Sequence, residues 1–160
     1  MLGALMFASK LLMEFLPNVH LIGVFIVALT VGYRAKALYP LYVFILLTGI
    51  YAGFNLWWIP YLYIWLPLWG AAMLLPKKMP DKVRPFAYLA ICAAHGFLYG
   101  TLYAPMQALM YGLNWDGMIA WIVAGIPYDL IHGFSNLVCA LLVTPLIRIL
   151  RFADRDRRTA

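Results

Sequence analysis

Charged residues are scarce in this sequence. Only 11% of the 160 residues are charged, six of them acidic, whereas 66% are apolar. A water-soluble domain of this size cannot bury so much apolar surface, so the composition excludes a soluble globular protein and predicts an integral membrane protein. At about 20 residues for each membrane-spanning helix, six spans with short turns use the whole chain. No room is left for a nucleotide-binding domain.

Cysteine and catalytic motifs are also scarce. Cys92 and Cys139 both lie within apolar runs, which is typical of small buried side chains and excludes a disulfide framework. No Gly-x-Ser-x-Gly, His-Glu-x-x-His or Walker-type run occurs. Asp129, His132 and Ser135 follow one another along one predicted helix, where a catalytic triad rarely aligns. The sequence therefore predicts a protein that is not an enzyme, with no bound cofactor and no resident metal.

Six apolar segments alternate with short polar or proline-bearing turns. The predicted helices span residues 2–15, 20–33, 38–54, 61–75, 86–103 and 117–150. Pro127 and Pro145 predict kinks in the last of them, and residues 104–116 predict a loop or a partly re-entrant segment. The expected fold class is an all-α integral membrane protein with six transmembrane helices, forming one domain over residues 1–150. Residues 151–160 are expected to form a short charged cytoplasmic tail.

The basic residues gather on one side of this six-helix arrangement. Eleven of the twelve Lys and Arg residues fall in the turns after the second and fourth helices or at the C-terminal end, and only Lys10 falls elsewhere. Positive charge marks the cytoplasmic side, so both termini are predicted to be cytoplasmic. The outer side instead gathers aromatic and polar side chains: Asn18, His20, Asn55, Trp57, Trp58, Tyr61, Tyr63, Tyr111, Asn114, Trp115 and Asp116. These predict either a pocket for a flat ring that opens outward or an ordinary interfacial aromatic belt.

The last predicted helix carries three polar side chains at membrane depth. Asp129, His132 and Asn136 share one helical face because their spacings are three and four residues. Such groups are costly in lipid and are expected to face the protein interior. Asp129 is expected to accept a hydrogen bond from His132. The set predicts one wall of a ligand site, or alternatively an internal network that ties this helix to its neighbours.

Two further polar sets lie in other helices. His95, Tyr99 and Tyr103 form a stripe at four-residue spacing, which can stack against a ligand ring or pack against a neighbouring helix. Lys10 and Glu14 are four residues apart in the first helix and predict an ion pair. A contact from Glu14 to a ligand is the alternative for that residue.

Small residues recur at helical spacing. Ala4 and Ala8 form an Ala-x-x-x-Ala strip in the first helix, on which another helix can approach closely. The same spacing joins Gly49 to Gly53 and Gly96 to Gly100, where internal packing is expected.

With these features the chain resembles the substrate-binding membrane subunits, or S-components, of energy-coupling factor transporters, the vitamin-uptake systems of bacteria and archaea. The resemblance covers the size, the six spans, the cytoplasmic termini and the Ala4–Ala8 strip. It also covers the run Pro-Asn-Val-His-Leu at 17–21 and the run Gly-Ile-Pro-Tyr-Asp-Leu-Ile-His-Gly at 125–133. The resemblance implies a multi-pass protein of a bacterial or archaeal cell membrane that binds a vitamin or its precursor.

The resemblance also implies partners and site residues. A transmembrane coupling subunit is expected to dock on Ala4 and Ala8. Two cytoplasmic ATPases are expected to supply energy, so this chain should not bind ATP. Nucleic acid is not an expected partner either, because the basic residues lie at the ends of apolar runs. The implied substrate-binding residues are Asn55, Trp57, Trp58, Tyr61, His95, Tyr99, Asp129, His132 and Asn136. The family's nickel and cobalt branch carries a histidine close behind the initiating methionine. Because this chain begins Met1-Leu2-Gly3, a ring-bearing organic ligand is expected instead of a metal ion.

A membrane scaffold is the alternative function. Rod-shape-determining membrane proteins have a similar size and number of spans and bind partners instead of small molecules. A scaffold has little use for Asp129, His132 and Asn136 facing a cavity, so the surroundings of these three side chains distinguish the two hypotheses.

Overall fold

The chain is helical throughout the part that the structure describes. A computed structural model describes residues 1–159, with side chains placed as far as residue 155, and contains no strand in that range. The elements are α1 (Leu2–Leu12), α2 (Ile22–Tyr33), η1 (Arg34–Ala37), α3 (Leu38–Ala52), η2 (Leu56–Trp58), α4 (Tyr61–Ile64), α5 (Leu66–Leu74), α6 (Arg84–Phe97), α7 (Tyr99–Tyr111), α8 (Trp115–Cys139), η3 (Ala140–Leu142) and α9 (Val143–Thr159). The predicted all-α class is confirmed. Within the predicted tail, residues 151–159 continue α9, while Ala160 lies outside the described residues.

Three stretches are long and apolar enough to cross a membrane: Ile22–Ala52, Arg84–Tyr111 and Trp115–Arg155. The first of them turns at Arg34, where the backbone φ is +56°. The apolar helix α1 is shorter, since its 11 residues at 1.5 Å each give about 16 Å against a hydrocarbon layer of about 30 Å. The structure therefore shows a helical protein with stretches suited to a membrane, and six crossings stay a prediction.

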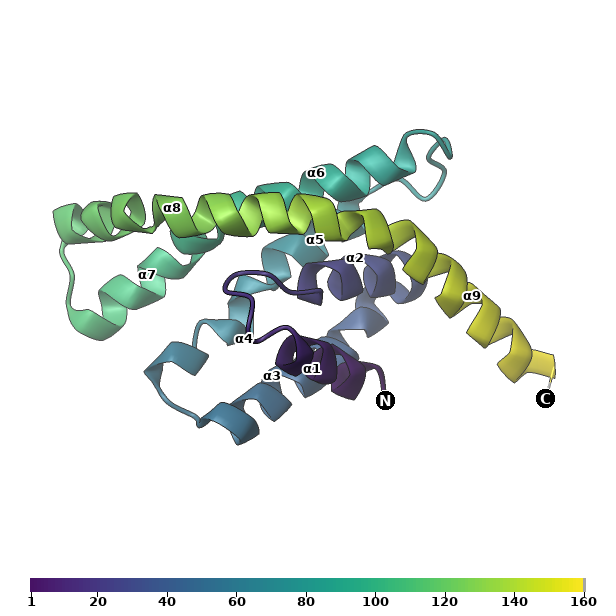
Figure 1. The fold of residues 1–160 in the computed structure, drawn as a ribbon, viewed down its shortest axis with the longest axis horizontal. Coiled ribbons are helices and arrows are strands. Elements are labelled where there is room, and N and C mark those ends of the chain that lie inside the picture. Colours follow the sequence, from purple (N-terminus) through teal and green to yellow (C-terminus); the bar gives the residue numbers. More distant parts are fainter. Residues whose placement is uncertain (160) are drawn as a thin grey trace.

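The helices pack in two groups on either side of α2. In Figure 1 α6 and α8 run side by side along the upper edge, and α8 continues through η3 into α9, which bends away. α1 and α3 pack together on the opposite side of the molecule, and α2 lies between the two groups with contacts to α5 and α9. Helix α2 also contacts both the first helix, α1, and the last, α9.

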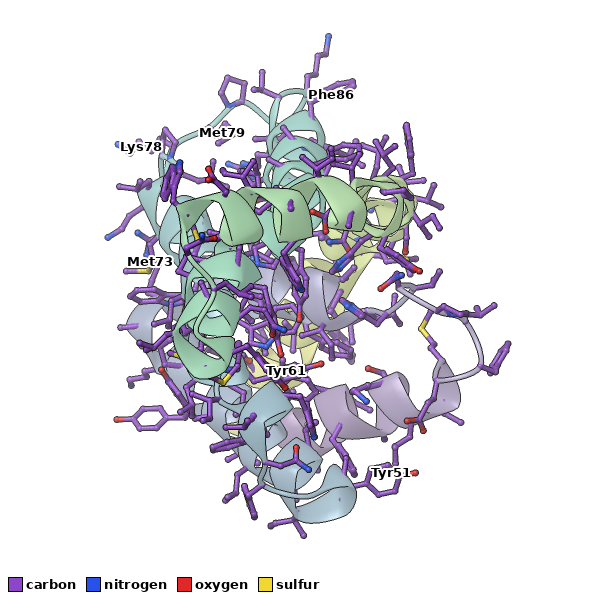
Figure 2. The ribbon with its side chains drawn as sticks, turned by 90° about the vertical axis from the view of Figure 1, so that its left-hand side faces the viewer. Tyr51, Tyr61, Met73, Lys78, Met79 and Phe86 are labelled. Atoms are coloured by element: carbon purple, nitrogen blue, oxygen red, sulfur yellow. The ribbon has the colours of Figure 1, made fainter. Side chains whose placement is uncertain are left out.

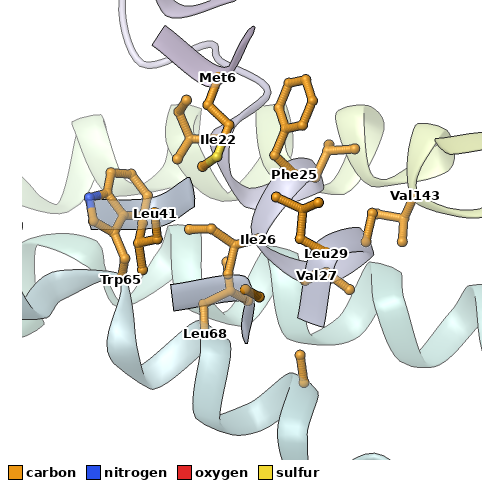
Figure 3. Packing of buried hydrophobic residues seen from close by; sticks show 14 of the residues in the cluster. Met6, Ile22, Phe25, Ile26, Val27, Leu29, Leu41, Trp65, Leu68 and Val143 are labelled. Carbon is orange, nitrogen blue, oxygen red and sulfur yellow. The ribbon is translucent and has the colours of Figure 1, made fainter. Parts of the chain in front are cut away.

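Helix α2 forms the centre of the core. Its residues from Ile22 to Thr30 are all buried, because its sequence offers no polar face. Figure 3 shows Met6 of α1, Leu41 of α3, Leu68 of α5 and Val143 of α9 around it. The Thr30 hydroxyl donates a hydrogen bond to the Ile26 carbonyl one turn earlier at 2.6 Å. This buried hydroxyl therefore has its partner within α2.

Prolines divide two of the predicted helices. The predicted helix at 61–75 consists of α4 and α5, which meet at Trp65; Pro67 in the first turn of α5 cannot donate to the preceding turn, so the two do not fuse. The predicted helix at 117–150 is interrupted at η3, just before Pro145 in the first turn of α9. Pro127 lies inside α8 without ending it.

The predicted loop at 104–116 is wrong. Helix α7 continues to Tyr111, and only residues 112–114 join it to α8. The stretch after Pro105 is rich in good helix formers such as Met, Gln, Ala and Leu. The helix ends instead at Gly112, which adopts the left-handed conformation with φ +65°. Asn114 then caps α8 by accepting a hydrogen bond from the Gly117 N–H at 2.8 Å.

Glycines allow α6 and α8 to approach closely. A Cβ on Gly96 would lie 2.7 Å from the Gly133 Cα, and one on Gly100 would lie 2.6 Å from an Asp129 carboxylate oxygen. Both distances are shorter than real Cβ contacts. Gly96 meets backbone, so that position requires glycine, whereas a side chain at Gly100 would displace the Asp129 carboxylate. The predicted internal packing of the Gly96–Gly100 pair is therefore confirmed.

Candidate ligand-binding site

Two adjoining cavities lie where the loop after α1 meets α4, α7 and α8. One has a volume of about 280 Å³ and is lined by residues that include Lys10, Glu14, His20 and Tyr61. The other, of about 270 Å³, is lined by residues of α7 and α8. Asn18, Tyr99 and His132 line both. We call the two together the histidine cavity.

Three aromatic rings form a continuous series along the histidine cavity. The centroids of Tyr99 and His132 are 4.6 Å apart, with ring planes inclined at 56°. His132 in turn meets the ring of His20 edge-on at 4.8 Å. His20 lies in the loop between α1 and α2, outside the stretches that could cross a membrane, and its burial lowers its pKa to about 4. The ring is therefore neutral near pH 7 and offers one donor and one acceptor.

Unpartnered polar atoms concentrate around this cavity. Among the described side chains, five buried nitrogen or oxygen atoms lack a hydrogen-bond partner, and four of them are His20 Nδ1, His132 Nε2, His95 Nδ1 and Trp65 Nε1. Leaving such an atom unsatisfied costs roughly 1–3 kcal/mol. Native structures hold few of them, and a cluster calls for an explanation such as a ligand or a water. Two of these four atoms belong to His20 and His132, which line the histidine cavity, and the other two belong to Trp65 and His95 behind it.

Trp65 and His95 form a second layer behind the cavity. Their ring centroids are 5.5 Å apart and the rings stack with an interplanar angle of 27°. The Trp65 ring also meets the His20 ring edge-on, with centroids 5.7 Å apart. His95 Nε2 lies 2.8 Å from the Ile64 carbonyl oxygen. Since a carbonyl only accepts, Nε2 carries the proton and Nδ1 is left as an acceptor. His95 is thus oriented by α4, one layer behind Tyr99.

Asp129 does not bind His132 as predicted. Its carboxylate accepts a hydrogen bond from the Gly100 N–H at 2.9 Å. Gly100 is the second residue of α7, and the first amides of a helix have no partner within the helix. A carboxylate is favoured there by the helix dipole, so Asp129 fixes the start of α7 while lining the histidine cavity.

Asn136 lies away from the histidine cavity. Its side-chain Nδ2 donates to the Cys92 carbonyl at 3.3 Å, and only 2% of the residue is exposed. It joins α8 to α6. The polar face of α8 thus combines both predicted roles, with His132 facing the cavity and Asn136 in an internal contact.

Two other predicted site residues also lie away from the cavity. Asn55 is exposed at the start of η2. Trp58 donates from Nε1 to the Ile45 carbonyl of α3 at 2.9 Å, and its ring meets Phe54 edge-on. Neither lines the histidine cavity. Trp58 anchors the η2 loop to α3.

Trp57 supports the cavity from outside. Its carbonyl accepts a hydrogen bond from the Tyr103 hydroxyl at 3.0 Å, and its ring meets Tyr61 edge-on at 5.6 Å. Tyr61 and Tyr103 are themselves lining residues, and Figure 2 places Tyr61 near the middle of the molecule. Trp57 therefore holds two residues of the wall.

Lys10 and Glu14 do not form the predicted ion pair. Among the described side chains, no oppositely charged atoms of these two residues lie within 4 Å of each other. The reason is that α1 ends at Leu12, so Glu14 has left the helical register that four-residue spacing requires. Both residues instead line the histidine cavity.

Three aromatic residues at the cavity were not among the candidates from the sequence. They are Trp121 and Tyr128, which line it, and Trp65 behind them. Lys10 and four of the candidates outside the implied substrate-binding set also line it, namely Glu14, Asn18, His20 and Tyr103. The helical face of Asp129 and His132, extended backward by steps of four, reaches Gly125 and Trp121, so these two could have been found. The approach of His20 and Trp65 depends on how distant segments fold together, and no local signal reveals it.

The predicted docking strip is accessible. Ala4 and Ala8 are both exposed, while Gly3 and Met6 on the other side of α1 are buried. A Cβ on Gly3 would lie 2.6 Å from the Pro40 carbonyl oxygen, so α1 rests closely on α3. The strip therefore faces away from the protein's own helices.

No group of three or more His, Cys, Asp or Glu side chains within the described part of the chain is placed to hold a metal ion. Comparison of the chain with protein-family models, with curated proteins and with solved structures finds no match.

Proposed function

We propose that this chain is the substrate-binding membrane subunit of an energy-coupling factor transporter, and that it captures a vitamin-like, ring-bearing molecule in the histidine cavity. The observation that carries the proposal is that the rings of His20, His132 and Tyr99 meet at one cavity, and that each imidazole has a buried nitrogen without a hydrogen-bond partner. A flat ring against Tyr99, with polar atoms on its edge, is the proposed partner of these imidazoles. Such sites combine aromatic walls with a few polar groups that fix orientation.

The cavity's size and charge favour a small heterocycle. Its two parts have volumes of about 280 and 270 Å³, close to the lower end of the roughly 300–1,000 Å³ typical of small-molecule sites. Lys10, Glu14 and Asp129 line it, so acids outnumber bases by one. A neutral or cationic ring fits this balance better than a strongly anionic one.

The positions of charge and cavity along the helices support uptake from outside. His20 lies two residues before α2 and Arg34 directly follows it, while Arg84 begins α6 and Tyr99 lies two residues beyond its end. The histidine cavity and the basic turns thus lie at opposite ends of the same helices. Under a six-span topology with cytoplasmic basic turns, the cavity lies toward the outer side.

The exposed Ala4–Ala8 strip supports docking to a coupling subunit. Small side chains one turn apart allow a partner helix to approach closely within a membrane. In the proposed complex, that subunit would link this chain to two cytoplasmic ATPases. The double variant Ala4→Trp with Ala8→Trp should lose co-purification with the coupling subunit, whereas Leu5→Trp, another exposed α1 position, should keep it.

Ligand capture is tested by thermal unfolding of the purified protein with a panel of vitamins and their precursors. At least one compound should raise the unfolding temperature of the wild type and of Ile131→Ala, an exposed position on α8, but not that of His132→Leu. A protein that ignores the whole panel and keeps its partner after both Trp substitutions would instead be a scaffold.

A further inference from the structure

A second cavity, separate from the histidine cavity, lies at the other end of α2 and α6. It has a volume of about 240 Å³, and its lining includes Arg34, Lys77, Arg84 and Arg151. These four residues come from η1, the loop after α5, the start of α6 and α9. The fold therefore brings together basic side chains that are far apart in the sequence. We call this the basic cavity.

Arg34 is held in place at the edge of the basic cavity. Its backbone adopts φ +56°, a conformation that is uncommon for a residue with a side chain. Its guanidinium donates to the Met73 carbonyl near the end of α5 at 2.5 Å, where a positive charge is favoured by the helix dipole. Arg34 is thereby fixed with its charge toward the cavity.

The charge of the basic cavity is not neutralised by its own lining. The remaining lining residues are Val31, Ala72, Leu75, Pro76, Met79 and Tyr88, none of them acidic. Asp81, outside the lining, pairs with Arg84 at 2.7 Å, and among the described side chains Arg34, Lys77 and Arg151 have no acidic partner within 4 Å. The 14-residue helix α6 also begins here, and the positive end of its dipole favours an anion. An anionic group with several oxygens matches this arrangement.

Apolar side chains flank the basic cavity. Leu74 is 85% exposed and Phe86 is 71% exposed. Leu74 directly precedes the lining residue Leu75, and Phe86 lies two residues after the lining residue Arg84. Figure 2 shows Phe86 at the same end of the molecule as Lys78 and Met79. A free inorganic anion has no contact to make with exposed apolar side chains, whereas an acyl chain attached to an anionic group does.

We propose that the basic cavity binds the phosphate group of an anionic phospholipid, with the acyl chains along the flank of Leu74 and Phe86. Clustered Lys and Arg side chains at the cytoplasmic ends of membrane helices recognise such headgroups. A bound headgroup joins the turn after α2, the loop after α5 and α9. It therefore steadies the basic end of the protein against unfolding.

The test measures thermal unfolding in a neutral detergent with added phosphatidylglycerol, phosphatidylcholine or inorganic phosphate. The double variant Lys77→Gln with Arg151→Gln removes two exposed lining charges. Lys78→Gln with Arg148→Gln removes the same net charge beside them, from positions outside the lining. Phosphatidylglycerol should raise the unfolding temperature of the wild type and this control by roughly 5 °C, and that of the lining variant by much less.

Three results would overturn the proposal. Equal stabilisation of all three proteins by phosphatidylglycerol would show that the basic cavity is not the site. Equal stabilisation by phosphatidylcholine would show that the anionic charge is not recognised. The same rise with millimolar inorganic phosphate alone would show that the cavity takes free phosphate instead of a lipid.

Discussion

His132 lies against Tyr99 with ring centroids 4.6 Å apart, and its Nε2 is buried without a hydrogen-bond partner. Two rings from different helices thus line one cavity, and one of them has a buried nitrogen without a partner. A residue selected only for packing would have either a partner for this nitrogen or an apolar side chain. Under the proposed function, this part of α8 serves a bound molecule more than the stability of the empty protein.

The first prediction follows from that unsatisfied nitrogen. His132→Leu replaces a buried polar ring with an apolar side chain and should raise the stability of the ligand-free protein by about 1 kcal/mol. The same variant should lose stabilisation by any ligand. Unfolding by heat or denaturant measures the first effect. If His132→Leu were clearly less stable than the wild type, the imidazole would have a structural role that the geometry does not show.

The second prediction concerns Asp129. Asp129→Ala removes the acceptor for the Gly100 N–H and should destabilise the protein by roughly 1–2 kcal/mol. Asp129→Asn keeps an acceptor oxygen and should lie closer to the wild type. Comparing the unfolding temperatures of the two variants checks the role of Asp129 at the start of α7. Equal losses in both would mean that the charge matters and the hydrogen bond does not.

The third prediction concerns the contact between α6 and α8. Gly96→Ala places a Cβ against the Gly133 backbone, so the helices must move apart at a cost of about 1–3 kcal/mol. Gly70→Ala in α5 meets no atom within 4 Å and should be neutral or stabilising, because alanine favours a helix. Unfolding temperatures of the two variants give the comparison. An unaffected Gly96→Ala protein would refute the close approach.

The sequence predicts helices and their ends well where neighbouring residues determine them. The apolar run of α2, the turn at Arg34 and the break before Pro145 all follow from neighbouring residues. Pro105 does not end α7, because good helix formers follow it. The left-handed Gly112 and the Asn114 cap were the better markers of the turn.

The site is only partly predictable, because some of its contacts join residues that are far apart in the sequence. His132 shares a face with Asp129 because both lie on one helix, so spacing alone predicts that face. Spacing does not predict that Asp129 binds Gly100 instead of His132, since that choice depends on where α7 begins. Nor does it bring His20 beside Trp65, because that contact needs the loop after α1 to fold over α4.

The fourth prediction concerns orientation in the membrane. In a background in which Cys139 is replaced by Ser, Asn55→Cys should react with a membrane-impermeant maleimide added to intact cells. Lys78→Cys should react only after the membrane is permeabilised. Both native residues are exposed, so accessibility within the protein does not limit labelling. The reverse pattern would turn the histidine cavity toward the cytoplasm.

Native mass spectrometry of the protein purified from its own membrane tests ligand capture by the histidine cavity most directly. The wild type should carry a bound small molecule of vitamin-like mass that is absent from His132→Leu and present in Ile131→Ala. An adduct of unchanged occupancy in all three proteins, or a wild type that stays bare even after incubation with the vitamin panel, would contradict the assignment of this cavity as the ligand site.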